Sequence, residues 1–181
     1  YLLPLVTLAP ILFFPSTAAM FACAREWVID KNYDNKLIRS FLRFYRENYR
    51  KSLIGGLLLT VVWATWYFDF NYFKDQNTTL MFTFIILGII LLAYTINFFS
   101  VIVHFDITLI KVFKNTFAVT LGSPVLLIAV LIVSAILFYI SVNGPLFLLL
   151  FFIFSLHAYV CFSAFYRLYL NLTNRTVQSN E

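Results

Sequence analysis

Four arginines in the first half of the chain are spaced so that they form one charged surface. They lie in the stretch Lys36–Lys51, KLIRSFLRFYRENYRK, at i, i+4, i+7 and i+11 of a predicted helix: Arg39, Arg43, Arg46 and Arg50. A neighbouring side of the same helix carries apolar and aromatic residues: Ile38, Phe41, Leu42, Tyr45 and Tyr49. The pattern predicts a basic amphipathic helix lying along a membrane surface.

This arginine stripe has three interpretations. It can bind anionic lipid headgroups, to which each basic residue contributes about 1 kcal/mol near the membrane surface. It can instead dock a cytoplasmic partner, or it can serve only to fix the orientation of the chain. Lipid binding and orientation together are favoured over a specific partner, because basic residues collect on cytoplasmic connections in general.

Two polar side chains lie deep within apolar runs, namely Asn97 and His157. They are intramembrane candidates for a functional site, although a hydrogen bond shared between two helices is the commoner role. His104 and Asp106 could form a proton relay or a metal pair, but side chains two positions apart on a helix point in different directions. We therefore interpret them as an interfacial pair at a helix end.

The sequence indicates no reaction. It contains no nucleophile elbow, phosphate loop, zinc-protease helix or pair of catalytic carboxylates. We therefore expect no enzyme, no cofactor and no metal site. Cys23 and Cys161 form no CxxC motif and both lie in apolar runs, so they are expected to be buried, unpaired thiols.

The composition is that of an integral membrane protein. Hydrophobic residues make up 62% and charged residues 12% of the chain, and the mean hydropathy is +0.88. Soluble domains are typically about 45–50% apolar and about 25% charged, so a soluble class is excluded. The net charge of +5 is explained by basic cytoplasmic loops rather than by a nucleic-acid partner.

The elements that must position these residues are five predicted spans. Each is close to the roughly 20 apolar residues that cross a bilayer. The five are Tyr1–Cys23, Leu53–Tyr67 with the aromatic residues after it, Thr79–Val103, Gly122–Val142 and Leu146–Leu170. They predict an all-α, polytopic transmembrane helical bundle as a single domain over residues 1–170, followed by a polar, disordered tail over residues 171–181.

Two local features refine this prediction. Pro15 is expected to break the first segment, with Ser16 or Thr17 capping a new helix that runs to about Ile29. The pair Gly55-Gly56 is expected to mark a close contact between helices, a common use of glycine within membranes.

The distribution of basic residues predicts the orientation. Of the 13 Lys and Arg residues, the region Arg25–Lys51 holds eight, the connection near residues 106–120 two and the C-terminal end two. The two alternate connections hold one and none. The basic side is therefore predicted to be cytoplasmic, with the amphipathic helix and the C-terminus on that side.

Several stretches also resemble a known family. They are LPLVTLAP at the start, Phe14–Phe21 with Arg25 and Trp27 after it, the run Phe41–Lys51, and the run from Gly56 to Tyr67 and Asp69. Together they resemble the YesL-like family of bacterial integral membrane proteins. The resemblance implies a place in the bacterial cytoplasmic membrane and further apolar residues before Tyr1, so we expect a truncated N-terminus. It supplies no catalytic residue.

Members of that family are largely uncharacterised and are often encoded near genes for carbohydrate uptake. The resemblance thus implies an accessory or assembly component of a carbohydrate-uptake system, with transporter subunits as partners. The alternative is a small membrane transporter in its own right, with Asn97 and His157 within its spans. The sequence leaves these two open.

Overall fold

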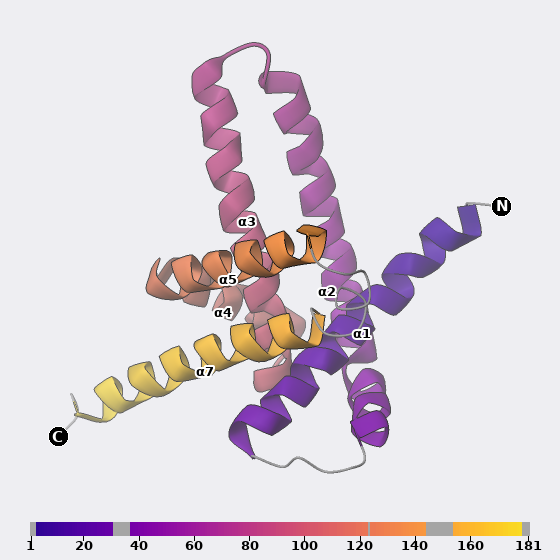
Figure 1. The fold of residues 1–181 in the computed structure, drawn as a ribbon, viewed down its shortest axis with the longest axis vertical. Helices are drawn as coiled ribbons and strands as arrows, with labels where there is room; N and C mark the ends of the chain where they lie inside the picture. Colours follow the sequence, from indigo (N-terminus) through magenta and orange to yellow (C-terminus); the bar gives the residue numbers. More distant parts are fainter. Residues whose placement is uncertain (1–2, 31–36, 123, 144–153, 179–181) are drawn as a thin grey trace.

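The computed structural model describes residues 3–30, 37–122, 124–143 and 154–178, and these form helices joined by short connections (Figure 1). The helices are α1 (Leu3–Ile29), α2 (Leu37–Phe73), α3 (Thr78–His104), α4 (Leu109–Gly122), α5 (Pro124–Asn143) and α7 (Phe154–Gln178). No strand occurs in these ranges. The predicted all-α fold is confirmed for this part of the chain.

Two of the helices, α2 and α3, are long and apolar enough to cross a membrane. A third span is obtained if α4 and residues 127–140 are counted together as one bent pair, with 92° between them. The structure therefore agrees with a helical membrane protein, but the predicted count of five is not confirmed. The beginning of the predicted span Leu146–Leu170 lies outside the described residues.

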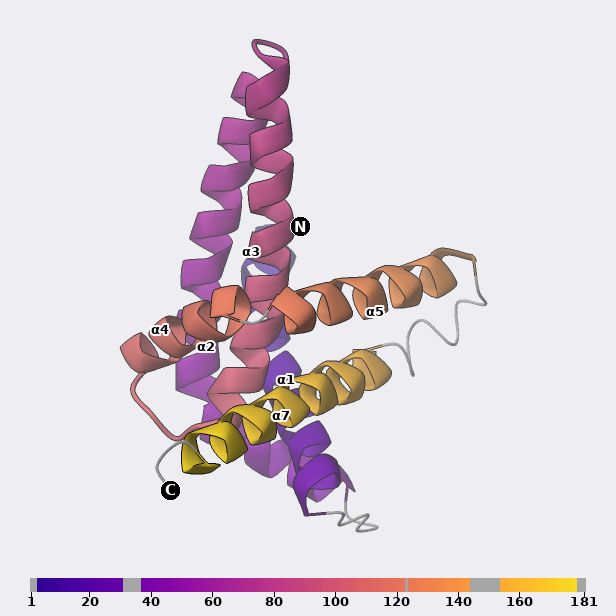
Figure 2. The same cartoon turned by 90° about the vertical axis from the view of Figure 1, so that its left-hand side faces the viewer.

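The hairpin of α2 and α3 forms the long axis of the molecule, and α4, α5 and α7 run across it rather than alongside it (Figures 1 and 2). Tryptophan side chains of α2 hold the hairpin together. The Nε1 atom of Trp66 donates to the carbonyl of Phe84 at 2.9 Å, and that of Trp63 donates to the hydroxyl of Thr95 at 3.1 Å. Asn77 caps the start of α3, where its side chain accepts a hydrogen bond from the amide of Thr79.

Glycines allow α2 to lie directly against two other helices. A Cβ atom on Gly55 would collide with the ring of Phe98 in α3, and one on Gly56 would collide with the ring of Phe14 in α1. Phe98 is fully buried in the apolar core that α1, α3 and α7 complete. The expected close contact at this glycine pair is confirmed, and its reason is that each glycine makes room for one aromatic ring.

The predicted break at Pro15 is wrong, because α1 runs through it as one helix. Next to the proline, the hydroxyl of Ser16 donates to the carbonyl of Leu12 at 2.6 Å, and that of Thr17 donates to the carbonyl of Phe13 at 2.8 Å. These hydroxyls are bonded within the helix, so neither caps a new one. Pro15 itself is buried, and packing against the other helices holds α1 continuous across it.

The end of the last helix also differs from the prediction. α7 does not stop at Leu170 but continues to Gln178, so most of the segment predicted as a disordered tail is helical.

The arginine stripe and the apolar run after it belong to one helix, α2, which has 37 residues. At about 1.5 Å per residue this helix is about 55 Å long, whereas the apolar core of a bilayer is about 30 Å thick. Its basic first part is therefore continuous with the apolar part in one helix. A separate helix lying in the membrane surface is not confirmed.

Candidate functional site

The first part of α2 buries a broader side than the one the sequence indicated. Phe44, Asn48 and Ser52, spaced four residues apart, turn inward, and Ser52 is fully buried. On the predicted apolar side, Phe41, Tyr45 and Tyr49 are half-buried as well, whereas Ile38 is 78% exposed. The helix α1 packs extensively along α2, and its Ala22 lines one cavity together with Phe44 and Asn48.

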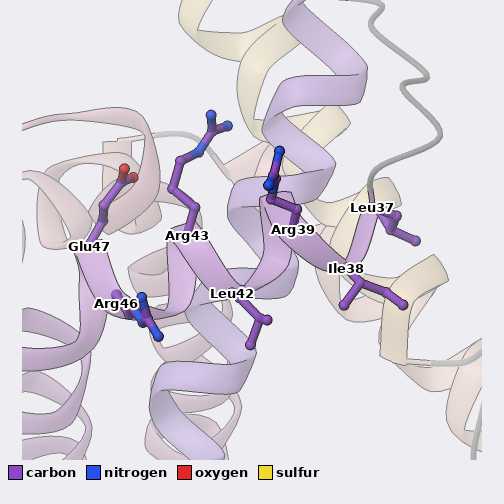
Figure 3. A pocket seen from close by; sticks show the side chains of 7 residues that line it. All are labelled: Leu37, Ile38, Arg39, Leu42, Arg43, Arg46 and Glu47. Carbon is purple, nitrogen blue, oxygen red and sulfur yellow. The ribbon is translucent and has the colours of Figure 1, made fainter.

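The exposed side of this segment forms an open groove of mixed chemistry, which we call the basic groove (Figure 3). Its lining consists of Leu37, Ile38, Arg39, Leu42, Arg43, Arg46 and Glu47. Arg50 is also exposed but does not line it. Three of the four predicted stripe residues thus share one surface with exposed apolar side chains.

The stripe arginines are not equivalent. Arg43 lies 3.4 Å from the carboxylate of Glu26 in α1 and 4.7 Å from the centre of the Phe44 ring, so it joins α2 to α1. In the described part of the chain, no ion pair involves Arg39, Arg46 or Arg50. All three side chains are exposed.

Asn97 is fully buried in α3. Its Nδ2 atom donates to the hydroxyl of Thr120 in α4 at 3.1 Å, while its Oδ1 atom has no hydrogen-bond partner among the described residues. The bond is a contact between two helices, which is the commoner of the two roles expected for this residue.

His157 makes a similar contact elsewhere, between α7 and α5. Its Nε2 atom lies 2.9 Å from the hydroxyl of Ser134, and that hydroxyl donates its single hydrogen to the carbonyl of Val130. His157 therefore donates through Nε2. The structure does not bring Asn97 and His157 together, since each is bonded to a different hydroxyl on a different helix.

A second group of polar residues, which the sequence did not connect, lines a cavity of about 400 Å³. Its polar members come from α1, α2, the end of α3 and the segment after it: Arg25, Glu47, Asn48, Lys51, His104 and Asp106. We call it the polar cavity. Ala22, Phe44 and three residues of the chain around His104 supply its apolar walls.

His104 and Asp106 share this cavity, contrary to the expectation that they diverge. The expectation assumed a helix through both residues, but α3 ends at His104 and Phe105 is extended, with φ −109° and ψ 125°. Beyond the helix end the backbone turns Asp106 toward α2, where its carboxylate accepts a hydrogen bond from Lys51 at 2.6 Å. This pair joins two parts of the chain that are 55 residues apart.

The Lys51 ammonium, by hydrogen bonding and by its charge, holds the pKa of Asp106 below its usual value. The carboxylate is therefore ionised at neutral pH. Because the Asp106 side chain is fully exposed, water screens the pair and its contribution to stability is small.

Arg25 is half-buried at the cavity wall, and no ion pair or hydrogen bond joins it to another described residue. Aromatic rings fix the His104 side chain beside it, with the centres of Phe105 and Tyr169 at 4.6 Å and 4.7 Å. The Nδ1 atom of His104 is buried and has no hydrogen-bond partner in the described chain.

The sequence held only a weak signal for this cavity. Asn48 and Ser52 are polar positions four residues apart on the side of α2 that turns away from the stripe, and Glu47 and Lys51 lie between that side and the stripe. Their partners, Arg25 and the residues at the end of α3, come from distant parts of the chain. No spacing rule connects them.

Other chemistry is limited in the described residues. Cys23 and Cys161 are both buried and unpaired, as predicted. No group of three or more His, Cys, Asp or Glu side chains in the described part is placed to hold a metal ion.

Comparison with known proteins agrees with the resemblance seen in the sequence. Residues 1–70 match the family described as "Protein of unknown function, DUF624". The chain is also similar to the uncharacterized protein YesL of Bacillus subtilis (strain 168), with 28% identity over 111 residues. That match covers 61% of this chain and 53% of YesL, so the chain spans about half the length of this relative. No solved structure matches. The resemblance to a YesL-like family of uncharacterised proteins is confirmed.

Proposed function

From the family match of residues 1–70 and the similarity to YesL, we propose that this chain is a multi-pass protein of the bacterial cytoplasmic membrane that acts as an accessory or assembly component of a transport system. Carbohydrate uptake is the proposed process, and transporter subunits are the proposed partners. The genomic setting of the family supports the choice of carbohydrate.

The observation that carries this proposal is the uncovered apolar surface of the α2–α3 hairpin. In both views the part of the hairpin near its turn extends beyond the other helices (Figures 1 and 2). Large apolar side chains cover its outer faces, with Phe68 72% exposed on α2 and Phe82 57% exposed on α3. In a bilayer such a surface contacts lipid tails or the spans of another protein.

Affinity purification of the full-length protein in mild detergent, followed by mass spectrometry, tests the assembly role. We expect subunits of a carbohydrate transporter to be recovered with the wild type. Replacing Phe68 and Phe82 by Ala should reduce that recovery, whereas Ile110→Ala, at an exposed apolar position of α4 outside the hairpin, should not. Reproducible recovery of the protein alone would contradict the proposal.

In the proposed orientation, the basic first part of α2 lies on the cytoplasmic side and the basic groove contacts anionic headgroups. Exposed Ile38 and Leu42 beside Arg39 and Arg46 support this role, because an apolar surface bordered by cations suits the boundary between headgroups and acyl chains. The C-terminus is proposed to lie on the same side.

The orientation is tested by changing Arg39, Arg46 and Arg50 to Gln while Arg43 is retained, because Arg43 also binds Glu26. Cysteine-accessibility mapping should then detect chains in the reversed or mixed orientation. The matched control changes the same three residues to Lys and keeps the charge. Normal orientation in the Gln variant would instead favour the groove as a docking surface for a protein.

A small transporter is the second candidate, and the bend of 92° between α4 and residues 127–140 favours it. Broken helices line substrate sites in many transporters. Flux in proteoliposomes should then fall on Asn97→Ala or His157→Ala. Since the two residues lie in separate contacts, each variant tests its own position. Unchanged flux in both would exclude these residues from a transport path.

A further inference from the structure

The polar cavity lies where the apolar parts of two helices end. Lys51 lies two residues before the apolar run of α2, and His104 is the last residue of α3. If these helices cross a bilayer as proposed above, the cavity lies at the level of the lipid headgroups. The inference below rests on that placement, but not on any assembly role.

Some of the charged residues of the cavity form an ion pair and others do not. Lys51 and Asp106 neutralise one another. In the described chain, neither Arg25 nor Glu47 has an ion-pair partner, although both line the same cavity and are not within 4 Å of each other. One cation and one anion thus line a shared space, and Glu47 also lines the basic groove next to it. A ligand that pairs with both must carry a negative group and a positive group.

The remaining walls set the size and character of that ligand. A volume of about 400 Å³ lies within the range of small-molecule sites, roughly 300–1,000 Å³. Apolar residues, including Ala22, Phe44 and Val103, form the rest of the lining and suit a short aliphatic link between the two charges. Guanidinium groups recognise phosphate through paired hydrogen bonds, and a carboxylate accepts hydrogen bonds from a primary ammonium.

We propose that the polar cavity binds a phosphoethanolamine group, with its phosphate at Arg25 and its ammonium at Glu47. Two sources carry this group: the headgroup of phosphatidylethanolamine, and soluble phosphoethanolamine. Asn48 and His104 lie in the same cavity and supply further polar contacts.

The test titrates the full chain, in a detergent without phosphate, with four probes and follows the heat of binding. The probes are short-chain phosphatidylethanolamine, phosphatidylglycerol and phosphatidylcholine, and soluble phosphoethanolamine. Phosphatidylethanolamine should bind at least about tenfold more tightly than phosphatidylcholine, whose quaternary ammonium has no hydrogen to donate to Glu47. Whichever phosphoethanolamine probe binds more tightly identifies the source.

Two variants test which residue binds the phosphate and which binds the ammonium of the ligand. Arg25→Gln should weaken the binding of every phosphate-containing probe about tenfold or more. Glu47→Gln should weaken the binding of only the two probes that carry a primary ammonium. The binding of phosphatidylglycerol should be unchanged or tighter. Arg46→Gln is the matched control, because Arg46 lies in the basic groove and not in the cavity.

Equal affinity for all headgroups would overturn the proposal. Unchanged binding in both cavity variants would also overturn it, as would a loss of affinity in Arg46→Gln equal to the loss in the cavity variants. If a variant fails to fold, a competition experiment on the wild type tests the assignment of the headgroup instead. Soluble phosphoethanolamine should then displace the lipid, and failure to do so while the lipid binds would contradict the assignment of the headgroup. Since no transporter subunit is present, this result is independent of the co-purification experiment.

Discussion

The ring of Phe98 in α3 lies directly over Gly55 of α2, in the space that a Cβ atom would otherwise occupy. Phe98 is completely buried and also contacts Phe99 and Phe113, so the ring has little room to move. The distance between α2 and α3 at this level is therefore set by the absence of one side chain.

We expect Gly55→Ala to destabilise the protein by about 1–3 kcal/mol, the usual cost of adding a methyl group to a filled core. Thermal unfolding in detergent measures the change. Gly122→Ala is the control, because no atom lies within 4 Å of a Cβ atom at that position. A Gly55→Ala variant as stable as Gly122→Ala would mean that the helices can separate at little cost.

Trp66→Phe removes the hydrogen bond from Nε1 to the carbonyl of Phe84 while retaining an aromatic ring against Gly88. The expected cost is about 1 kcal/mol, a typical net value for one hydrogen bond. Tyr67→Phe, one position along on the exposed side of α2, should change the thermal midpoint much less. If both variants melt alike, the tryptophan bond does not stabilise the hairpin.

The bond between Asn97 and Thr120 can be measured by a double-mutant cycle. Thr120→Val leaves the buried Nδ2 donor of Asn97 without a partner and should cost about 1–3 kcal/mol. Asn97→Leu should cost less, because it also removes the Oδ1 atom that has no partner in the described chain. Adding Thr120→Val to Asn97→Leu should then have little further effect. Additive losses would show that the two side chains are not coupled.

The two thiols should report the folded state. Cys23 and Cys161 are buried and unpaired, so a membrane-permeable maleimide should label them slowly until the protein unfolds. Labelling during a temperature ramp provides the unfolding curve that the variants above require. Cys23→Ser and Cys161→Ser separate the two signals. Rapid labelling of the native protein would contradict the burial of these positions.

Much of this protein follows from local sequence alone. The helical class, the apolar length of α2 and α3, the close contact at Gly55-Gly56 and the buried thiols depend on the hydropathy and size of neighbouring residues, which act wherever the helices lie. The resemblance to a YesL-like family also rests on the order of residues in the chain.

Other features depend on how distant helices meet, and the sequence could not determine them. Where α1 packs against α2, Ser52 is buried, whereas Ile38 of the predicted apolar side is left exposed. The helix α1 likewise continues across the buried Pro15, where local rules predict a break.

The polar cavity is the clearest case. Arg25, Lys51 and His104 belong to three helices, and Asp106 joins them only because α3 ends two residues earlier and the chain turns back toward α2. Composition and periodicity determined that this chain forms apolar helices with a basic end. Only the tertiary structure decided which charged residues face one another there, because that depends on contacts between segments far apart in sequence.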